Sequence, residues 1–300
     1  MHVFVTGATG LIGRMICGAL LGRGHLVTAI SRGGRAPQRL PIGVRAVEGD
    51  PSRPGKWQEA LATADACLNL AGEPIAEGRW STWKKQRILE SRVESTSRVA
   101  EVIAARGPAI LVSGSAVGIY GDRGDDPLDE TSTPGTGFLA DVCRAWEDAA
   151  APARGRARVV LLRTGIVLAR DGGALPRMAL PFRLYAGGPI GDGAFWQPWI
   201  HLADEVGLAV LALEDARVEG PLDACAPEPV RNRDLARAIG RALHRPCAVP
   251  APRAAVRLAL GEAADAVLAS QRVLPRKALS LGYHFRFTDV DAAVVDLLGG

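Results

Sequence analysis

The first 170 residues alternate short apolar stretches with segments of helical periodicity, and this alternation constrains the fold more than any other feature. Apolar stretches of strand length occupy residues 2–5, 25–30, 44–47, 66–70, 110–113 and 158–167. Apolar side chains recur at helical spacing over residues 11–23, 81–106 and 138–151. Strands joined through helices pair in parallel with right-handed crossovers. The pattern therefore predicts an α/β fold built on a doubly wound parallel sheet of the Rossmann type.

A glycine-rich turn joins the first expected strand to the first expected helix. It consists of Gly7, Ala8, Thr9, Gly10, Leu11, Ile12 and Gly13. Glycines here allow a tight turn, a close approach of the backbone to a pyrophosphate, and close packing of the helix on the strand. The helix N-terminus adds unpaired N–H groups and the positive end of its dipole. The turn therefore predicts a dinucleotide site to which all seven residues contribute.

The end of the second expected strand indicates which dinucleotide binds. Proteins that bind an unphosphorylated ribose usually have an acid at this position, whereas this chain has Ser31 and Arg32, with Arg35 close behind. A guanidinium pairs with a 2′-phosphate, which a carboxylate would repel. We therefore expect NADP(H) to be favoured over NAD(H), the alternative being that Arg32 only solvates a loop. Asp50, which closes the third strand, is expected to reach the adenine.

Other strand ends are expected to meet the same cofactor, because ligands of such sheets bind outside the carboxyl ends of the strands. The residues concerned are Leu70, Ala71 and Gly72 after the fourth strand, Ser113 in the fifth, and Arg163 and Gly165 in the sixth. We expect all of them to contact the cofactor.

Beyond residue 170 the alternation gives way to glycine and proline turns, which indicates a second, smaller unit. The elements predicted there are helices at 204–213, 234–243 (with Asn232 as N-cap) and 253–269, a strand at 283–287, and a last helix opened by Thr288. We expect residues 1–170 and 203–245 to form the NADP-binding domain. Residues 171–202 and 246–300 are expected to form a smaller C-terminal substrate lobe over the carboxyl edge of the sheet.

Seven stretches carry a resemblance to a known family. They are TGATGLIGR, NLAGEPIAEGRW, SGSAVGIYGDRG, LLRTGIVLARDGGAL, PFRLYAGGPIGDG, PWIH and RVLPRKALSLGY, beginning at residues 6, 69, 113, 161, 181, 198 and 272. Together they resemble the extended short-chain dehydrogenase/reductase superfamily, and within it a divergent epimerase-like branch that ends in a small domain of unknown function. The resemblance spans essentially the whole chain. It implies a Rossmann-type fold, an NADP(H)-type cofactor and a nucleoside-sugar epimerase type of protein, without an established substrate.

The resemblance also implies a catalytic apparatus, which this chain carries only in part. The superfamily's strand-five serine, which positions the substrate oxygen, corresponds to Ser115. A Glu–Pro stretch, present here as Glu130 and Pro134, then leads to a Tyr-x-x-x-Lys pair whose tyrosine takes the proton of the hydroxyl. Here the pair reads Phe138 and Val142. Phenylalanine has no acidic proton and valine no charge, so the usual acid–base machinery is incomplete.

Three explanations for the incomplete pair remain open. First, another group stands in for it. Tyr120, five residues after Ser115, has the nearest tyrosine hydroxyl in sequence, and these two are our expected catalytic residues, although Tyr120 is equally compatible with packing at the turn. More distant candidates are Lys84, Lys85, Asp141, Cys143 and His201. Second, the protein reduces an activated carbonyl or quinone, a reaction that needs less acid–base help. Third, it binds NADP(H) without turnover, as a sensor or scaffold.

A cluster of aromatic residues at 195–201 is expected to lie under the smaller lobe. Trp199 and His201 are predicted to line a substrate pocket, the alternative being a packed hinge between sheet and lobe. A sugar nucleotide would need phosphate contacts there. The arginines that could supply them are Arg163, Arg177 and Arg183.

Composition limits the partners. The net charge of +4 is small, its cationic residues are scattered, and the one dense group, at 84–87, is interpreted as a solvated helix face, so we expect no nucleic-acid or membrane partner. The five cysteines form no Cys-x-x-Cys pair and none stands at ligand spacing from a histidine, so no metal site is predicted. No apolar run approaches the roughly 20 residues of a membrane span. We expect a cytoplasmic NADP-dependent oxidoreductase or epimerase that acts on a small molecule as a monomer or homodimer.

Overall fold

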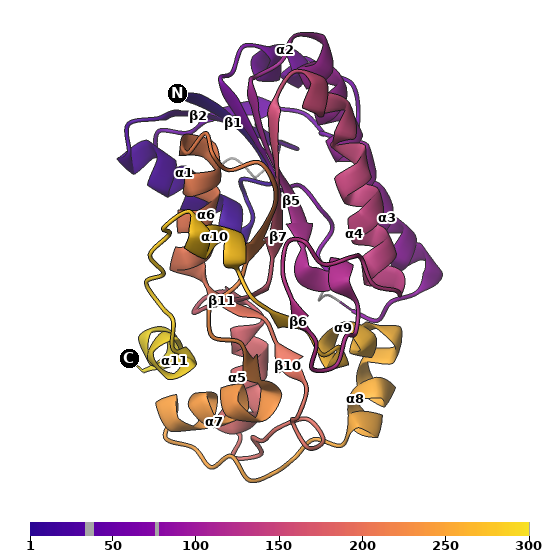
Figure 1. Cartoon of the computed structure of the whole chain (residues 1–300), viewed down its shortest axis with the longest axis vertical. Helices are drawn as coiled ribbons and strands as arrows, with labels where there is room; N and C mark the ends of the chain where they lie inside the picture. The colour runs from indigo at the N-terminus through magenta and orange to yellow at the C-terminus, as the bar shows by residue number, and fades with distance from the viewer. Residues whose placement is uncertain (34–38, 76–77, 300) are drawn as a thin grey trace.

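The computed structural model describes residues 1–33, 39–75 and 78–299 and has a seven-stranded parallel sheet at its centre (Figure 1). The strand order is β12-β7-β5-β4-β1-β2-β3, so the chain reverses its direction of travel between β1 and β4. The strands are β1 (His2–Thr6), β2 (Leu26–Ser31), β3 (Arg45–Glu48), β4 (Ala66–Asn69), β5 (Ile110–Ala116), β7 (Arg158–Thr164) and β12 (Gly220–Ala224). This architecture confirms the predicted Rossmann-type fold class.

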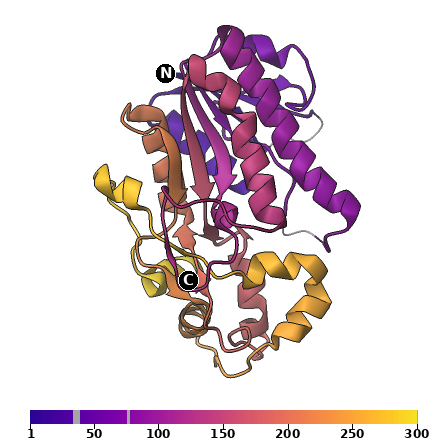
Figure 2. The same cartoon turned by 45° about the vertical axis from the view of Figure 1, so that its right-hand side comes forward.

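Helices cover both faces of the sheet, as Figures 1 and 2 show. One face packs against α1 (Leu11–Gly22) and α6 (Leu202–Glu214), and the other against α2 (Trp57–Ala62), α3 (Thr82–Arg106) and α4 (Phe138–Ala149). The alternation of side chains along β1 sets the two faces apart. Val3 and Val5 join the α1–α6 core, whereas Phe4 points the other way and stacks on Trp57. Burying a side chain of this size stabilises the fold by about 1.5–3 kcal/mol.

A second core lies below the carboxyl edge of the sheet in Figure 1. It joins α5 (Leu175–Arg183), α7 (Asn232–Ala242) and α11 (Val290–Leu298) around Trp199, next to β8 (Ile166–Ala169), β9 (Gly172–Gly173) and β11 (Trp199–His201). Because α7 packs with α5 and α11, it belongs to this core. The expected domain limit at residue 245 stays a prediction, and this packing favours a limit soon after β12.

The C-terminal segment crosses back to the sheet. It contains α8 (Arg253–Leu260), the 3₁₀ helix η4 (Gly261–Ala263), α9 (Ala264–Leu268), β14 (Arg272–Val273) and α10 (Arg276–Ser280). The strand β14 pairs with β6 (Pro127–Leu128), in the long loop between β5 and α4. A second short pair joins β10 (Trp196–Gln197) to β13 (Val230–Arg231). These pairs tie the smaller lobe to loops at the carboxyl edge of the sheet.

Three sequence-based expectations about elements were wrong. Residues 283–287 are irregular, because the carboxylate of Asp204 accepts the backbone N–H groups of Arg286 and Phe287 that a strand would use. The two expected helix caps are displaced by one residue. Arg231 is the N-cap residue of α7, and Asp289 caps α11 by accepting from the backbone N–H of Ala292.

Two longer predicted elements are each divided by a glycine. The stretch 158–167 becomes β7 and β8, separated by Gly165, where a Cβ would collide with the carbonyl oxygen of Pro198. The stretch 253–269 becomes α8, η4 and α9, and Gly261 at the break has a φ of +59°. Within the described residues, no helix is both long enough and apolar enough to cross a bilayer.

Candidate functional site

The turn between β1 and α1 contains three glycines, and a side chain would meet a different environment at each. Gly7 has a φ of +70°, and a Cβ there would lie 2.7 Å from the backbone of Leu70. A Cβ at Gly13 would collide with the carbonyl oxygen of Gly7, so Gly13 permits α1 to pack closely on the turn. Gly10 is exposed, and a Cβ there would meet only the Gly7 oxygen, at 3.3 Å. The fold itself therefore requires Gly7 and Gly13, whereas Gly10 keeps a surface open.

The N-terminus of α1 lies at that open surface. Gly10 is its N-cap residue and supplies no side-chain hydrogen bond, and the first turn, all of which the structure describes, has no acidic residue. The first N–H groups of a helix have no intrahelical acceptor, and the helix dipole is positive at this end. Ala8 is buried, whereas Thr9, Leu11 and Ile12 are partly exposed around the turn. An anion such as a diphosphate fits this cradle of backbone donors.

Thr6, at the end of β1, fixes the neighbouring loop after β4. Its hydroxyl donates to Oδ1 of Asn69 at 2.7 Å and accepts the backbone N–H groups of Leu70 and Ala71 at 3.1 and 3.0 Å. Gly72, the next residue, is exposed. Leu70 and Ala71 are thus held against the glycine turn, and the contact of residues 70–72 with the cofactor stays a prediction.

The end of β2 presents Ser31 and Arg32 at the same edge. Ser31 is buried, and its hydroxyl oxygen has no hydrogen-bond partner among the described residues, whereas Arg32 is exposed. Partial burial raises the pKa of Asp50, but the backbone N–H and hydroxyl of Ser52 and the nearby Arg32 and Arg53 charges outweigh burial and lower it. Asp50 and Arg32 therefore lie near each other as opposite charges. Arg35 falls outside the described residues.

Three neighbouring strands place Ser115, Arg163 and Asp223 side by side. Ser115 on β5 is in register with Arg163 on β7, which is in register with Asp223 on β12. The hydroxyl of Ser115 donates to Oε1 of Glu147 on α4 at 2.7 Å. Arg163 donates from Nε and Nη2 to the two oxygens of Glu147 at 2.8 and 2.9 Å. The result is a buried ion pair directly beneath the serine at the carboxyl end of β5.

Tyr120 closes the same network. Its hydroxyl donates to Asp223 at 2.8 Å and accepts from Nη1 of Arg163 at 2.9 Å, and its side chain is fully buried. Burial is the main reason that the pKa of Tyr120 is raised far above its usual value, and the Asp223 charge adds to this while Arg163 opposes it. Burial also raises the pKa of Asp223 well above its ordinary range. This environment favours the packing alternative for Tyr120 over a proton donor in contact with substrate.

Glu147 and Asp223 are the members of this network that sequence reasoning missed. A signal for Glu147 exists, because it follows Cys143 and Trp146 on the apolar face of α4, where an acid needs a partner. Asp223 gives no such signal, because its strand begins with Gly220 and Pro221 and does not resemble a strand in sequence.

The positions of the incomplete pair, Phe138 and Val142, and their neighbours Leu139 and Cys143 have different surroundings on α4. Phe138 and Val142 pack in a cluster with Trp80. Leu139 and Cys143 instead lie against Gly118, where a Cβ would be 3.4 and 3.7 Å from them. Burial raises the pKa of the Cys143 thiol to about 12, so it is neutral at physiological pH. Leu139 and Cys143, the two α4 residues against Gly118, therefore carry neither a phenol nor a charge.

The remaining proton-transfer candidates have partners elsewhere. Lys84 forms an ion pair with Glu73 at 2.8 Å, and Lys85 pairs with Glu262 at 2.6 Å. Asp141 is exposed and pairs with Arg144 at 2.9 Å, one turn along the same helix. These contacts lie along α3 and the solvent side of α4.

Trp199 and His201 are buried in the second core. Trp199 is fully buried, and its Nε1–H donates to the carbonyl oxygen of Glu228 at 3.1 Å. Nδ1 of His201 accepts the backbone N–H of Ala203, and the ring stacks on Phe287 with 3.9 Å between centroids. Burial lowers the pKa of His201, so the ring is neutral at pH 7. Both environments favour the packed hinge over the substrate pocket.

The other residues singled out from the sequence have varied surroundings. Ser113 is fully buried, and its hydroxyl oxygen has no partner among the residues that the structure describes. Gly165 donates its N–H to the carbonyl oxygen of Ala224 at 2.9 Å. Arg177 and Arg183 lie exposed on α5, and Arg163 is occupied by Glu147.

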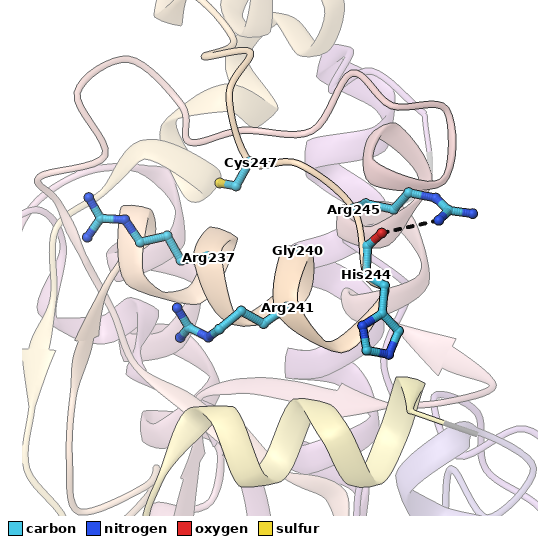
Figure 3. A pocket seen from close by; sticks show the side chains of 6 residues that line it. All are labelled: Arg237, Gly240, Arg241, His244, Arg245 and Cys247. Carbon is cyan, nitrogen blue, oxygen red and sulfur yellow. Dashed lines mark hydrogen bonds between the residues drawn. The ribbon is translucent and has the colours of Figure 1, made fainter.

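A cavity of about 420 Å³ lies at the C-terminal half of α7 and the residues that follow it (Figure 3). It is lined by Arg237, Gly240, Arg241, His244, Arg245 and Cys247. Arg241 is already paired with Asp291 on α11, and Arg237 with Asp234. None of the residues expected from the sequence to bind cofactor or substrate lines it.

The parallel sheet and the uncapped glycine turn at its switch point define a dinucleotide-binding protein of the Rossmann type. The profile of the NAD dependent epimerase/dehydratase family matches residues 3–223, and that of a domain of unknown function, DUF1731, matches residues 251–297. The chain belongs to the NAD dependent epimerase/dehydratase family. This confirms the resemblance seen in the sequence.

Several relatives match over nearly the full chain. The chain is 39% identical to the chloroplastic epimerase family protein SDR39U1 homolog of Arabidopsis thaliana, over 98% of this chain and 86% of that protein. A structure of human epimerase family protein SDR39U1 with NADPH superposes with a TM-score of 0.88 at 35% identity, covering 99% of each chain. A nucleoside-diphosphate sugar epimerase from Corynebacterium glutamicum gives a TM-score of 0.81 at 37% identity, over 100% of this chain and 58% of that one.

Proposed function

We propose that the protein is an NADP(H)-dependent oxidoreductase or epimerase-like enzyme that acts on a small activated carbonyl or a sugar nucleotide. The observation that carries this proposal is the open surface at Gly10, where the uncapped N-terminus of α1 offers backbone donors to a diphosphate. The bound NADPH in the similar human structure supports the choice of cofactor. When bound, NADPH supplies a hydride.

Arg32 is proposed to select the phosphorylated cofactor. It is exposed at the end of β2, next to the buried Ser31, whose hydroxyl has no partner among the described residues. A guanidinium and a hydroxyl together suit a 2′-phosphate. Other structures with this fold were solved with NAD, so the preference for NADP(H) is a proposal for this chain.

Ser115 is proposed to hold the substrate oxygen. Because it donates its own proton to Glu147, its oxygen presents lone pairs, which accept a hydrogen bond from a substrate hydroxyl. To donate to a carbonyl oxygen, the hydroxyl must rotate away from Glu147. The proton that completes a carbonyl reduction comes from water in this scheme, because Tyr120 is buried and its pKa is raised.

This scheme predicts which substrates react. The sequence contains Tyr120, Tyr185 and Tyr283, and none has a lysine four residues later. A positioned acid–base group contributes about 10²–10⁴-fold to a rate. Without one, oxidation of unactivated alcohols is expected to be slow, whereas an activated carbonyl accepts a hydride more readily.

The test is steady-state oxidation of NADPH with 9,10-phenanthrenequinone and with simple secondary alcohols and NADP⁺. We expect measurable quinone reduction, a large loss in Ser115→Ala, and little alcohol oxidation. Fast alcohol oxidation that is lost in Tyr120→Phe would show that Tyr120 accepts the hydroxyl proton. Tight NADPH binding with no turnover of any carbonyl would favour the second candidate, a non-catalytic NADP(H) sensor or scaffold. The hydrogen bond from Tyr120 to Asp223 agrees with that candidate, because it leaves the tyrosine proton engaged inside the protein.

Three broader expectations remain proposals. We propose a small-molecule substrate, no nucleic-acid or membrane partner, and a monomer or homodimer. A cytoplasmic location stays a prediction, since one relative is named as chloroplastic. The smaller lobe, including α8 and α9, is proposed to cover the substrate.

A further inference from the structure

Arg92 on α3 is an inward-facing cation that the scheme above does not use. Its Nη1 donates to the carbonyl oxygens of Glu73 and Ile88, both at 3.0 Å. Its guanidinium lies over the ring of Trp146 on α4, 5.0 Å from the centroid. The helices α3 and α4 lie side by side on one face of the sheet (Figures 1 and 2). Arg92 is therefore wedged between two helices and the loop that follows β4.

Arg92 has no ion-pair partner of the kind that other charged side chains near it have. The carboxylate of Glu73, the acid next to it, pairs with Lys84 at 2.8 Å. Arg163, by contrast, donates hydrogen bonds to both carboxylate oxygens of Glu147. Among the residues that the structure describes, Arg92 has no carboxylate partner, and its Nε and Nη2 have no hydrogen-bond acceptor. Arg92 is partly exposed, so a ligand can reach these unused donors.

The unused donors lie at the cofactor edge. A Cβ added to Gly72 would be 3.1 Å from Cζ and 3.3 Å from Nη2 of Arg92. Gly72 is exposed and follows Leu70 and Ala71, which Thr6 fixes beside the glycine turn. The guanidinium thus lies against the exposed loop that the sequence assigns to cofactor binding.

Arg92 also lies beside the part of α4 where a cation is missing. Burial lowers the pKa of Arg92, and the neighbouring Cys143 and Glu73 oppose this shift, which places the guanidinium close to both. Cys143 faces the end of β5, where it lies 3.7 Å from a Cβ built on Gly118. A positive charge on α3 therefore lies close to Cys143, an α4 residue that carries no charge itself.

We propose that Arg92 contacts the nicotinamide half of NADP(H), its free N–H groups binding ribose hydroxyl oxygens, and that it supplies the positive charge that a lysine on α4 supplies elsewhere in the superfamily. This rests on the proposed function, since it presumes a cofactor at the glycine turn. A lysine cannot make the same contacts from α3, because its single ammonium lacks the planar fork that reaches two carbonyls and a ligand at once.

The test compares NADPH with a fragment that lacks the nicotinamide half. Calorimetry measures the affinities of NADPH and of adenosine 2′,5′-bisphosphate for the wild type, Arg92→Met, Arg92→Lys and the control Arg98→Met. Arg98 lies on the same helix but is exposed and pairs with Glu101. Loss of a charged hydrogen bond is expected to weaken NADPH about ten- to a hundredfold in Arg92→Met and less in Arg92→Lys. The fragment should bind all four proteins alike.

Each outcome has a distinct meaning. A folded Arg92→Met that binds NADPH as tightly as the wild type overturns the inference, and so does an equal loss for NADPH and the fragment. A wild type that binds neither compound overturns the proposed function itself.

A second measurement needs no variant. Phenylglyoxal modifies accessible arginines, and mass spectrometry maps the sites in the wild type alone, with NADP⁺, and with the fragment. We expect NADP⁺ alone to protect Arg92, and both compounds to protect Arg32. NADP⁺ is used because NADPH could reduce the dicarbonyl reagent. Equal modification of Arg92 with and without NADP⁺ would contradict the inference even if the variants fail to fold.

Discussion

Arg163 holds both carboxylate oxygens of Glu147, with Nε–Oε1 and Nη2–Oε2 distances of 2.8 and 2.9 Å. The pair joins β7 to α4 inside the protein, and the hydroxyl of Ser115 rests on it. The same guanidinium reaches Tyr120, and through it Asp223 on the edge strand β12. One arginine thus organises the polar surroundings of three strand ends.

Removing the carboxylate of this pair should be strongly destabilising. Glu147→Gln leaves the charge of Arg163 buried without a counter-ion, and breaking a buried pair in this way typically costs about 3–5 kcal/mol. Urea denaturation measures the loss. The matched control is Asp141→Asn, on the same helix, whose exposed pair with Arg144 should leave the midpoint unchanged. Equal midpoints for both variants would show that the buried pair contributes nothing to stability.

Arg32→Ala tests the cofactor preference. If Arg32 binds the 2′-phosphate, NADP(H) binds the unmutated protein about ten- to a hundredfold more tightly than NAD(H), as expected for a charged hydrogen bond of roughly 1.5–3 kcal/mol. The substitution should remove most of that difference and leave the NAD(H) affinity nearly unchanged. Calorimetry with both cofactors measures it. Equal affinities in the unmutated protein contradict the assignment.

Two glycine substitutions separate binding from folding. Gly10→Val should abolish binding of both dinucleotides, because a branched side chain then fills the open surface. The extended backbone at Gly10 (φ −76°, ψ 172°) suits valine, and the one close contact of its Cβ is the Gly7 oxygen at 3.3 Å. Gly13→Ala should instead lower the melting temperature, because its Cβ meets the carbonyl oxygen of Gly7. Thermal melts and NADPH titrations on both variants are the measurements. A stable Gly10→Val protein that binds NADPH normally would show that the turn is not a cofactor site.

Glu205 predicts a pH-dependent stability. It is fully buried on α6, its Oε1 accepts from the hydroxyl of Thr164 at 2.7 Å, and its Oε2 has no partner among the described residues. Burial raises its pKa to about 7, above the ordinary value of 4.5. A carboxyl whose pKa is raised by folding favours the folded state below pH 4.5, and this contribution is lost as the pH rises through 7.

Glu205→Gln keeps the neutral shape at every pH and removes this dependence. The variant and the wild type should therefore have similar free energies of unfolding near pH 4.5. At pH 8 the value of the variant should be higher by up to about 3 kcal/mol, because each unit of pKa shift corresponds to about 1.36 kcal/mol. Urea denaturation at the two pH values measures the difference. A difference between variant and wild type that is the same at both pH values would contradict the raised pKa.

The order of strands and helices follows from sequence patterns because each pattern is local. Alternating apolar stretches and helical spacing fixed the fold class, and the glycine turn marks the strand–helix junction where the fold requires Gly7 and Gly13. The strand β12 escaped notice because Gly220 and Pro221 open it, and because its pairing with β7 supplies what its own residues lack. Residues 283–287 look like a strand, yet the distant carboxylate of Asp204 takes their N–H groups.

The environment of Ser115 could not be predicted in the same way. It depends on register across three strands and on an acid from α4, which become neighbours only when the sheet has formed. Likewise, nothing in the local sequence of Tyr120 indicates that its hydroxyl meets Asp223, about a third of the chain away. The sequence indicated where polar side chains gather, but only the folded structure shows which of them form hydrogen bonds with one another.

The short pairing of β14 with β6 has a consequence for how the chain is made. Residues 272–273 complete a ladder begun by residues 127–128, so nearly half of the chain must be synthesised between the two partners. Contacts of such high sequence separation form late, because loop closure opposes them until both ends are present. During translation, β6 in the loop between β5 and α4 therefore stays unpaired until the C-terminal residues that form β14 leave the ribosome. That interval, in which the sheet is nearly complete and its site still open, is when the chain is most exposed to aggregation and to chaperones.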